Sequence, residues 1–128
     1  MTARKAMILF AHGARDPRWA EPLERLAEVI RARDPGMPVA LAFLELTTPT
    51  LQQAVDTLAA QGPGRIDLLP VFWSGGGHVV RDLPKMLADA QARHPDIEME
   101  ILPVLSDLPG VLDAVAAAAI GYSTRGSV

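Results

Sequence analysis

The stretch Lys5–Ile30, KAMILFAHGARDPRWAEPLERLAEVI, decides the fold of this chain of 128 residues. It opens with the nearly continuous apolar run Lys5–Ala11, which is typical of a parallel strand covered on both faces. It ends with a helix whose apolar residues recur at intervals of three and four: Leu23, Leu26, Ala27 and Ile30. A strand followed by such a helix is the unit of a parallel α/β sheet with right-handed crossovers.

The same unit occurs three more times along the chain. Strands are predicted at Val39–Leu44, Ile66–Trp73 and Ile97–Leu102, and the last alternates apolar with acidic residues, as an edge strand does. The three further helical stripes are Leu51, Ala54, Val55, Leu58; then Leu83, Met86, Leu87, Ala90; and finally Leu108, Val111, Leu112, Val115. We therefore predict a flavodoxin-like (βα)₄ fold, a doubly wound parallel sheet with strand order 2-1-3-4.

Local signals predict where these elements begin and end. Pro22 indicates that the first helix begins near Glu21. Pro70 breaks the rule against proline in a central strand, so the third strand either carries a bulge or is shorter than its apolar run. Three further helix starts are predicted, at Thr48 with Pro49, Asp82 before Pro84 and Asp107 before Pro109. Three helix ends are predicted at Gly62, Pro95 and Gly121.

Composition narrows the class of protein. The chain is 49% hydrophobic and 21% charged, as ordinary globular domains are, and its net charge of −3 gives no electrostatic footprint for nucleic acid. It contains no cysteine, no apolar run long enough for a membrane span and no secretory signal pattern. We expect a single cytoplasmic domain over residues 1–122, followed by a disordered tail over residues 123–128.

Chemistry is expected where the carboxyl ends of adjacent strands 1 and 3 meet, at the switch point of the sheet. The loop after strand 1 carries His12, the loop after strand 3 carries His78, and Glu45 closes strand 2. Two neutral imidazoles and a carboxylate suit a divalent metal such as Co, Ni, Fe or Zn, and they also suit general base catalysis. On the sequence alone, Glu45 as an ordinary solvated acid is an equal alternative.

Other residues near these loops have two interpretations each. The run Gly75, Gly76, Gly77 either forms a tight turn or lets a ligand approach the backbone closely. The tryptophans Trp19 and Trp73 either line a flat pocket or pack in the core. Four cationic residues lie in or just after these two loops, although the chain as a whole is acidic: Arg15, Arg18, Arg81 and Lys85. They are either ordinary surface charges or a basic rim that binds an anionic ligand. His94 is interpreted as a favourable charge at a helix C-terminus.

Three stretches resemble a known family. They are ILFAHGARDPRW from Ile8, FLELTTPTLQQAV from Phe43 and LPVFWSGGGHVVRDLP from Leu69. They are similar to the short sirohydrochlorin chelatases of the CbiX type, class II tetrapyrrole chelatases that insert a divalent metal without ATP. The resemblance runs from about Ile8 to Val104. The family usually has serine where this chain has Ala14.

The resemblance implies a flavodoxin-like fold and an enzyme that inserts a divalent metal, Co²⁺ first and Ni²⁺ or Fe²⁺ as alternatives, into sirohydrochlorin or a related tetrapyrrole. The metal is then a substrate, with no organic cofactor. It also implies that His12 and His78 are the catalytic pair and that Glu45 is a third metal contact. The substrate-binding residues proposed beside them are Arg15, Gly75, Gly76, Gly77 and Arg81. Because long members carry two such domains around a cleft, the chain corresponds to one half of that bilobal architecture, and a homodimer is expected.

Two other functions fit the same residues. A module of this fold can hold a tetrapyrrole or a metal for delivery without catalysing insertion. The glycine loop can also bind a phosphate or nucleotide, although no Walker or GxGxxG pattern accompanies it. Saturable turnover distinguishes the enzyme from the carrier, and a nucleotide-dependent shift in melting temperature identifies the third function.

Overall fold

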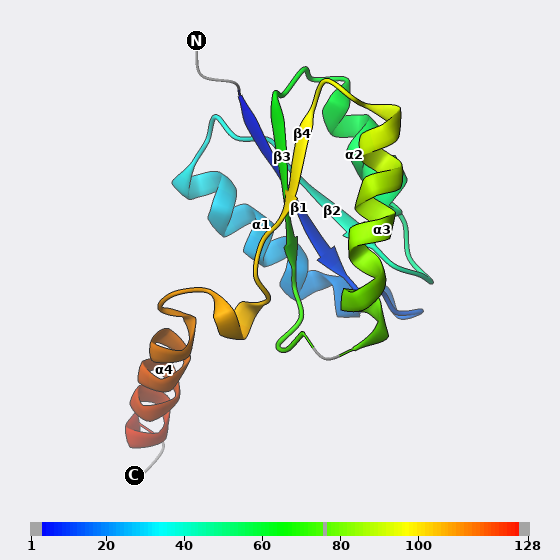
Figure 1. Cartoon of the computed structure of the whole chain (residues 1–128). Helices are drawn as coiled ribbons and strands as arrows, with labels where there is room; N and C mark the ends of the chain where they lie inside the picture. Colours follow the sequence, from blue (N-terminus) through cyan, green and yellow to red (C-terminus); the bar gives the residue numbers. More distant parts are fainter. Residues whose placement is uncertain (1–3, 76, 126–128) are drawn as a thin grey trace.

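Four parallel strands form the centre of the molecule (Figure 1). The computed structural model describes residues 4–75 and 77–125, without the side chains of residues 78 and 79. The strands are β1 (Lys5–Ala11), β2 (Val39–Phe43), β3 (Arg65–Pro70) and β4 (Glu98–Ile101), and their order is β2-β1-β3-β4. The predicted strand order and the edge position of the fourth strand are therefore confirmed.

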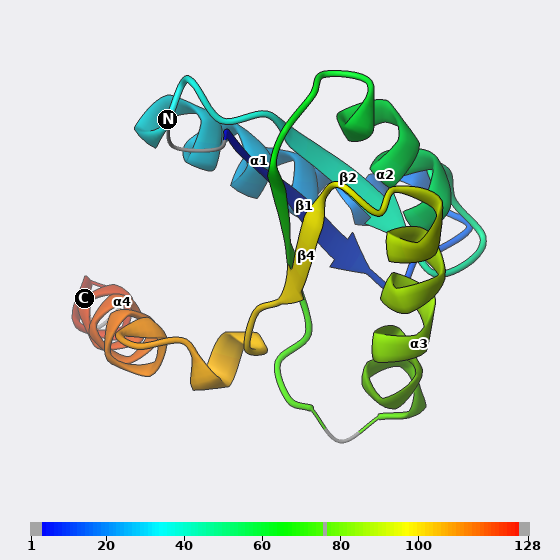
Figure 2. The same ribbon diagram turned by 45° about the horizontal axis from the view of Figure 1, so that its top comes forward.

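Helices cover the two faces of this sheet unequally. The α-helices are α1 (Glu21–Arg33), α2 (Leu51–Ala59), α3 (His78–Arg93) and α4 (Val111–Arg125), and the short 3₁₀ turns are η1 (Pro17–Ala20) and η2 (Leu105–Asp107). Helices α2 and α3 pack on one face and α1 packs on the other (Figures 1 and 2). Helix α4 projects away from the sheet in both views.

Alternation along each strand sorts the core into two apolar clusters. In β1, Ile8 and Phe10 belong to the cluster under α2 and α3, and Leu9 belongs to the cluster under α1. All three side chains are fully buried. The two-residue period of a strand thus explains why the run is continuously apolar, because both of its faces are covered.

The proline predicted in the central strand lies at the end of that strand. Pro70 is the last residue of β3, so this strand is shorter than its apolar run. The next residue, Val71, donates its N–H to the carbonyl of Phe10 in β1. Successive N–H groups alternate in direction, so the nitrogen of Pro70 faces β4, whose pairing has already ended at Leu68 and Ile101. Pro70 therefore lies at the point where the pairing of β3 with β4 stops.

The predicted start of the first helix at Glu21 is confirmed, but three other predicted helix starts are wrong. The cap of α2 is Thr50, which forms a capping box with Gln53. Helix α3 begins at His78, and Pro84 lies inside it rather than in its first turn. The segment at Asp107 forms η2, and α4 begins only at Val111. For α2, the capping box at Thr50 outweighs the signal at Thr48 with Pro49.

Only three residues of the fourth predicted stripe, Val111, Leu112 and Val115, lie in α4, and they are not buried as the pattern predicts; Leu108 precedes the helix and packs against the cluster under α1. Every residue of α4 from Leu112 onwards is exposed. The helix also continues through Gly121, where an end was predicted, to Arg125, so residues 123–125 of the expected tail form its last turn. Residues 126–128 lie outside the described part of the chain. Within the described ranges, no helix is both long enough and apolar enough to span a bilayer.

Candidate functional site

The loops that leave β1 and β2 run side by side at the carboxyl edge of the sheet. Leu44 donates its N–H to the carbonyl of Ala11 at 3.0 Å, and Glu45 donates to the carbonyl of His12 at 3.2 Å. These hydrogen bonds hold the two loops together just beyond the last paired residues of the strands, Ala11 and Phe43. It places the imidazole Nε2 of His12 and the carboxylate Oε1 of Glu45 3.7 Å apart. The two residues expected to act together are therefore adjacent.

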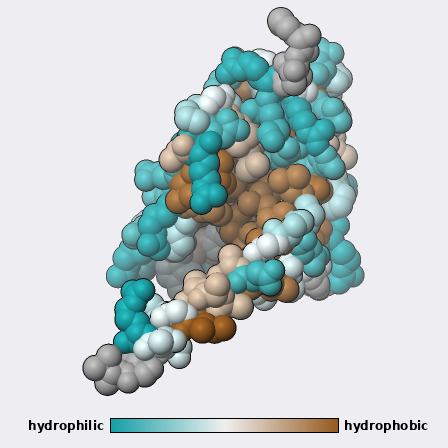
Figure 3. All heavy atoms as spheres, turned by 90° about the vertical axis from the view of Figure 1, so that its left-hand side faces the viewer, coloured by the Kyte–Doolittle hydropathy of each residue, from teal (hydrophilic) through white to brown (hydrophobic). Residues whose placement is uncertain are grey.

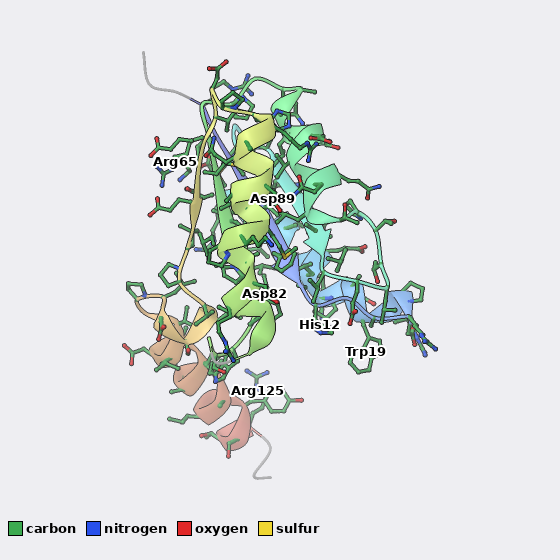
Figure 4. The ribbon with its side chains drawn as sticks, turned by 45° about the vertical axis from the view of Figure 1, so that its right-hand side comes forward. His12, Trp19, Arg65, Asp82, Asp89 and Arg125 are labelled. Atoms are coloured by element: carbon green, nitrogen blue, oxygen red, sulfur yellow. The ribbon has the colours of Figure 1, made fainter. Side chains whose placement is uncertain are left out.

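Both side chains are accessible to a ligand. The side chain of His12 is 55% exposed and that of Glu45 is 54% exposed. In Figure 4, His12 and Trp19 point outward at the same end of the molecule. An exposed imidazole and carboxylate carry little desolvation cost, so they can exchange a bound ion with solvent.

The close approach of the two loops depends on a glycine. Gly13 has a φ of +99°, which L residues rarely adopt, and a Cβ added there would lie 1.9 Å from the carbonyl oxygen of Glu45. Glycine is therefore the residue that lets the chain turn directly after His12 and still touch the backbone of Glu45.

Thr47 connects the loop after β2 to the loop after β1 by hydrogen bonds, a role that the sequence did not reveal. Its hydroxyl donates to the carbonyl of Ala14 at 2.6 Å and accepts from the N–H of Ala14 at 3.3 Å. The contact uses only the backbone of Ala14, so the absence of the usual serine hydroxyl leaves this connection intact. The threonine lies within the quoted stretch FLELTTPT, but only the contact across the loops shows its role.

The separation of His12 and Glu45 is compatible with one shared metal ion. Imidazole nitrogen and carboxylate oxygen bind such an ion at about 2.1 Å each, so two donors of one ion lie at most about 4.2 Å apart. Their 3.7 Å separation falls within that limit. No group of three or more His, Asp or Glu residues that could hold a metal occurs among the described side chains. The side chain of His78, the predicted third ligand, lies outside that description.

The glycine loop joins β3 to α3. Gly77 is the N-cap of α3, and Gly75 is exposed with room for a Cβ, whose nearest neighbours would lie 4.0 Å away. Gly76 lies outside the described residues. This loop and His78, the first residue of α3, follow β3. Because β3 is the neighbour of β1, they follow a strand adjacent to the one that ends at Ala11, directly before His12. Whether the glycines contact a ligand stays a prediction.

The four cations near these loops differ in their partners. Arg18 forms a bidentate ion pair with Asp16, and this pair together with the N–H of Arg18 lowers the pKa of Asp16. Asp16 also caps η1, so Arg18 helps to hold that turn. The exposed side chains of Arg15, Arg81 and Lys85 form no ion pair with any side chain that the structure describes.

Both tryptophans lie at the surface, so the interpretation as core residues is wrong. Trp19 is 75% exposed and Trp73 is 53% exposed. Trp19 also lines a hollow of about 100 Å³, together with Gly13 and Thr47 from the two loops described above. An exposed indole beside the His12 loop offers a flat apolar surface to a ligand.

His94 lies away from these loops and has a structural partner. It is the C-cap of α3, and its Nε2 lies 2.8 Å from the carboxylate of Asp56 in α2. This hydrogen bond, followed by the ion pair with Arg93, lowers the pKa of Asp56. The cluster ties α2 to α3, in agreement with its prediction as a structural residue.

Similar proteins point to one family. A family model described as CbiX matches residues 6–120. The chain is 39% identical over 82 residues to a sirohydrochlorin cobaltochelatase of Methanopyrus kandleri and 37% identical over 90 residues to that of Methanocaldococcus jannaschii. These matches cover 64% and 70% of this chain, and 57% and 63% of the respective relatives.

Solved structures agree with this match. A CbiX protein from Marinobacter aquaeolei VT8 superposes with a TM-score of 0.81 at 28% identity, over 95% of this chain and 99% of that one. The sirohydrochlorin chelatase SirB from Bacillus subtilis subspecies spizizenii, in complex with cobalt, superposes with a TM-score of 0.70 at 25% identity, over 78% of this chain and 43% of that one. The strand order and the family match together lead to one conclusion: the chain belongs to the CbiX family.

Proposed function

We propose that this protein inserts a divalent metal, Co²⁺ in the first place, into sirohydrochlorin or a closely related tetrapyrrole, without ATP. The observation that carries the proposal is the exposed pair of His12 and Glu45, 3.7 Å apart at the carboxyl edge of the sheet. The relatives named sirohydrochlorin cobaltochelatase support the choice of metal and macrocycle.

In the proposed reaction, His12 and Glu45 hold the incoming ion beside the macrocycle, and His78 adds the third donor. An imidazole nitrogen binds the ion through its lone pair, so His12 must be neutral at that moment. The ion then exchanges protein ligands for four pyrrole nitrogens, and the two pyrrole N–H protons leave. The imidazole that the departing ion vacates accepts one proton and the carboxylate of Glu45 accepts the other, so that two protons replace the two positive charges of the ion on the protein.

Arg15 and Arg81 are proposed to bind the carboxylates of the macrocycle. Both are exposed cations without an ion-pair partner among the described side chains, so neither must break an existing pair to bind an anion. Guanidinium groups recognise carboxylates through two parallel hydrogen bonds. Truncation of either arginine is expected to raise KM for the tetrapyrrole more than it lowers kcat.

The test is anaerobic metal insertion by purified protein, followed through the absorbance of sirohydrochlorin with Co²⁺, Ni²⁺ and Fe²⁺ in separate reactions. We expect multiple turnovers above the uncatalysed rate. His12→Ala is expected to lower the rate by about 100-fold or more, as the loss of a proton acceptor does. His94→Ala is the matched control, because it removes a histidine that contacts Asp56 and not the His12 loop.

Three outcomes would contradict the proposal. Stoichiometric binding of metal or macrocycle without turnover identifies a carrier. Equal rates for His12→Ala and wild type refute the assignment of the site. A melting temperature that rises with nucleotide, with no response to metal, favours a phosphate binder instead.

We propose that the chain acts as a homodimer. It spans 43% of the SirB chain with which it superposes over 78% of its own length, so a single copy corresponds to less than half of that protein. Two copies would together supply about the length of chain that the longer protein has.

A further inference from the structure

Exposed apolar side chains occur in the loops that leave the carboxyl edge of the sheet. Leu46, in the loop after β2, is 58% exposed, and Trp19 and Trp73 follow β1 and β3 in the same way. The other large apolar side chains that the structure describes as exposed lie on α1 and α4, and Figure 3 shows apolar side chains of α4 at the surface. Three neighbouring strands are therefore each followed by one large apolar side chain in solvent.

Leu46 has a backbone conformation that leucine residues avoid. Its φ is +66°, the only positive φ outside glycine in the described part of the chain. In this region the Cβ of an L residue lies too close to the carbonyl oxygen that follows it, so a bulky side chain is rarely found there. Leu46 belongs to neither apolar cluster of the core and packs against neither. Burial of its side chain therefore does not explain why a leucine occupies this position.

The two neighbours of Leu46 hold it in this conformation. Glu45 donates its N–H to the carbonyl of His12. Thr47 forms two hydrogen bonds with the backbone of Ala14. Both neighbours are thus tied to the loop after β1, so the chain between them turns at Leu46. Backbone strain that the surrounding structure maintains is concentrated at active sites and ligand-binding segments, and the place of Leu46 directly after Glu45 points to a role in binding.

Trp19 is also held at the surface beside these two loops. The turn η1 that carries it is closed by the hydrogen bond from the N–H of Trp19 to the carbonyl of Asp16, at 3.0 Å, and the side chain of Asp16 caps the same turn. Trp19 lines the hollow of about 100 Å³ together with Gly13 and Thr47. These two residues belong to the loops after β1 and β2, so Trp19 adjoins both loops that form the candidate site.

The two apolar side chains suit the face of a flat ring. A tetrapyrrole is a largely planar conjugated macrocycle, with apolar faces and with its carboxylates on the rim. An ion held by His12 and Glu45 reaches the pyrrole nitrogens only through one of these faces, so that face must lie against the site. An indole stacks on a conjugated ring, and a leucine covers apolar surface. A free metal ion or a phosphate gains nothing from either side chain.

We propose that Leu46 and Trp19 bind the face of the tetrapyrrole next to the proposed metal site. The positive φ of Leu46 serves this contact and lowers the stability of the fold. The two arginines assigned to the carboxylates bind the rim of the same macrocycle, so its face and its rim are recognised by different side chains. The inference rests on the proposed function, because the macrocycle is the ligand of both.

The first test compares the stability of Leu46 variants with their affinity for the macrocycle. Glycine and asparagine adopt a positive φ more readily than leucine does, so Leu46→Gly and Leu46→Asn should melt at the wild-type temperature or up to about 4 °C above it. The dissociation constant for metal-free sirohydrochlorin, titrated anaerobically, should rise by about 5-fold or more because the apolar contact is lost. Val29→Ala is the matched control, since Val29 is a 51% exposed residue in the C-terminal half of α1, and this variant should bind as wild type does.

The second test separates contact with the macrocycle from metal binding and from charge. Trp19→Ala is expected to raise KM for sirohydrochlorin by about 10-fold and to change kcat by less than about twofold, and Trp19→Phe should restore most of the affinity. Co²⁺ affinity, measured by calorimetry without the macrocycle, should be the same in every variant. In about 1 M NaCl the effect of Trp19→Ala should persist while that of Arg15→Ala shrinks, because salt screens charges but not apolar contacts.

Each measurement has a result that overturns the inference. Lower melting temperatures for both Leu46 variants identify a structural residue. Unchanged affinity in Leu46→Gly or Trp19→Ala, with a wild type that binds sirohydrochlorin and turns it over, refutes the contact and leaves the proposed function intact. Weaker Co²⁺ binding in the Leu46 variants shows that Leu46 positions Glu45 instead of touching the ring. A wild type that neither binds sirohydrochlorin nor inserts metal contradicts the proposed function itself.

Discussion

Replacing Gly13 by alanine tests whether the contact between the two site loops governs both stability and metal binding. The new Cβ would lie 1.9 Å from the carbonyl oxygen of Glu45, so the loops must separate. That movement breaks the two hydrogen bonds between Ala14 and Thr47. It also removes Glu45 from its place beside His12.

Two contributions determine how much Gly13→Ala lowers the free energy of unfolding. A positive φ costs an L residue about 1–2 kcal/mol, and each lost hydrogen bond costs about 1 kcal/mol. Gly13→Ala is therefore expected to lower the free energy of unfolding by about 3–4 kcal/mol. Gly62→Ala is the matched control, because Gly62 has a φ of +74° but nothing lies within 4 Å of its added Cβ. Its expected cost is the backbone part alone, about 1–2 kcal/mol.

The assay is urea unfolding followed by circular dichroism, with Co²⁺ binding to the folded proteins measured by calorimetry. Gly13→Ala should lose both stability and Co²⁺ affinity, whereas Gly62→Ala should lose a little stability and bind Co²⁺ as wild type does. Equal stability losses in the two variants would refute the steric argument. Wild-type Co²⁺ affinity in Gly13→Ala would show that the His12–Glu45 contact is not needed for the metal.

Three further predictions concern other parts of the molecule. Thr47→Val removes both hydrogen bonds to Ala14 and should weaken Co²⁺ binding with a loss of about 1–2 kcal/mol in urea unfolding; unchanged affinity would show that Thr47 does not position the site. Phe10→Ala empties a fully buried position that contacts Phe72 edge to face and should cost about 3–5 kcal/mol in the same assay; a loss under 1 kcal/mol would contradict tight packing there. Because His94 and then Arg93 lower the pKa of Asp56 in the folded state, that pair stabilises the protein above the unfolded pKa of about 3.9. The stability that wild type holds over Asp56→Asn at pH 7 should accordingly shrink as the pH falls through the folded pKa of Asp56 in acid unfolding curves, and a constant difference would contradict the assignment.

The sequence determined the sheet and the place of the site. Continuous apolar runs predicted strands buried on both faces, and the strand–helix alternation required a parallel sheet whose carboxyl ends share one edge. His12 and Glu45 each follow such a strand, so their meeting at this edge could be predicted without coordinates. Both inferences depend on periodicity and chain connectivity, which are properties of the sequence alone.

The helix boundaries and the contacts of individual side chains could not be predicted from the sequence alone. The local signal at Asp82 with Pro84 predicted the start of α3, but the helix already begins at His78 and Pro84 lies inside it, so that signal by itself did not locate the start. The role of Thr47 and the position of Arg65 among acids from two strands depend on strand register, which no local pattern contains. The spacing of apolar residues in α4 predicted that one face of this helix is covered, but it did not predict which element covers it. Periodicity is a property of one helix, whereas burial requires a second element to pack against it.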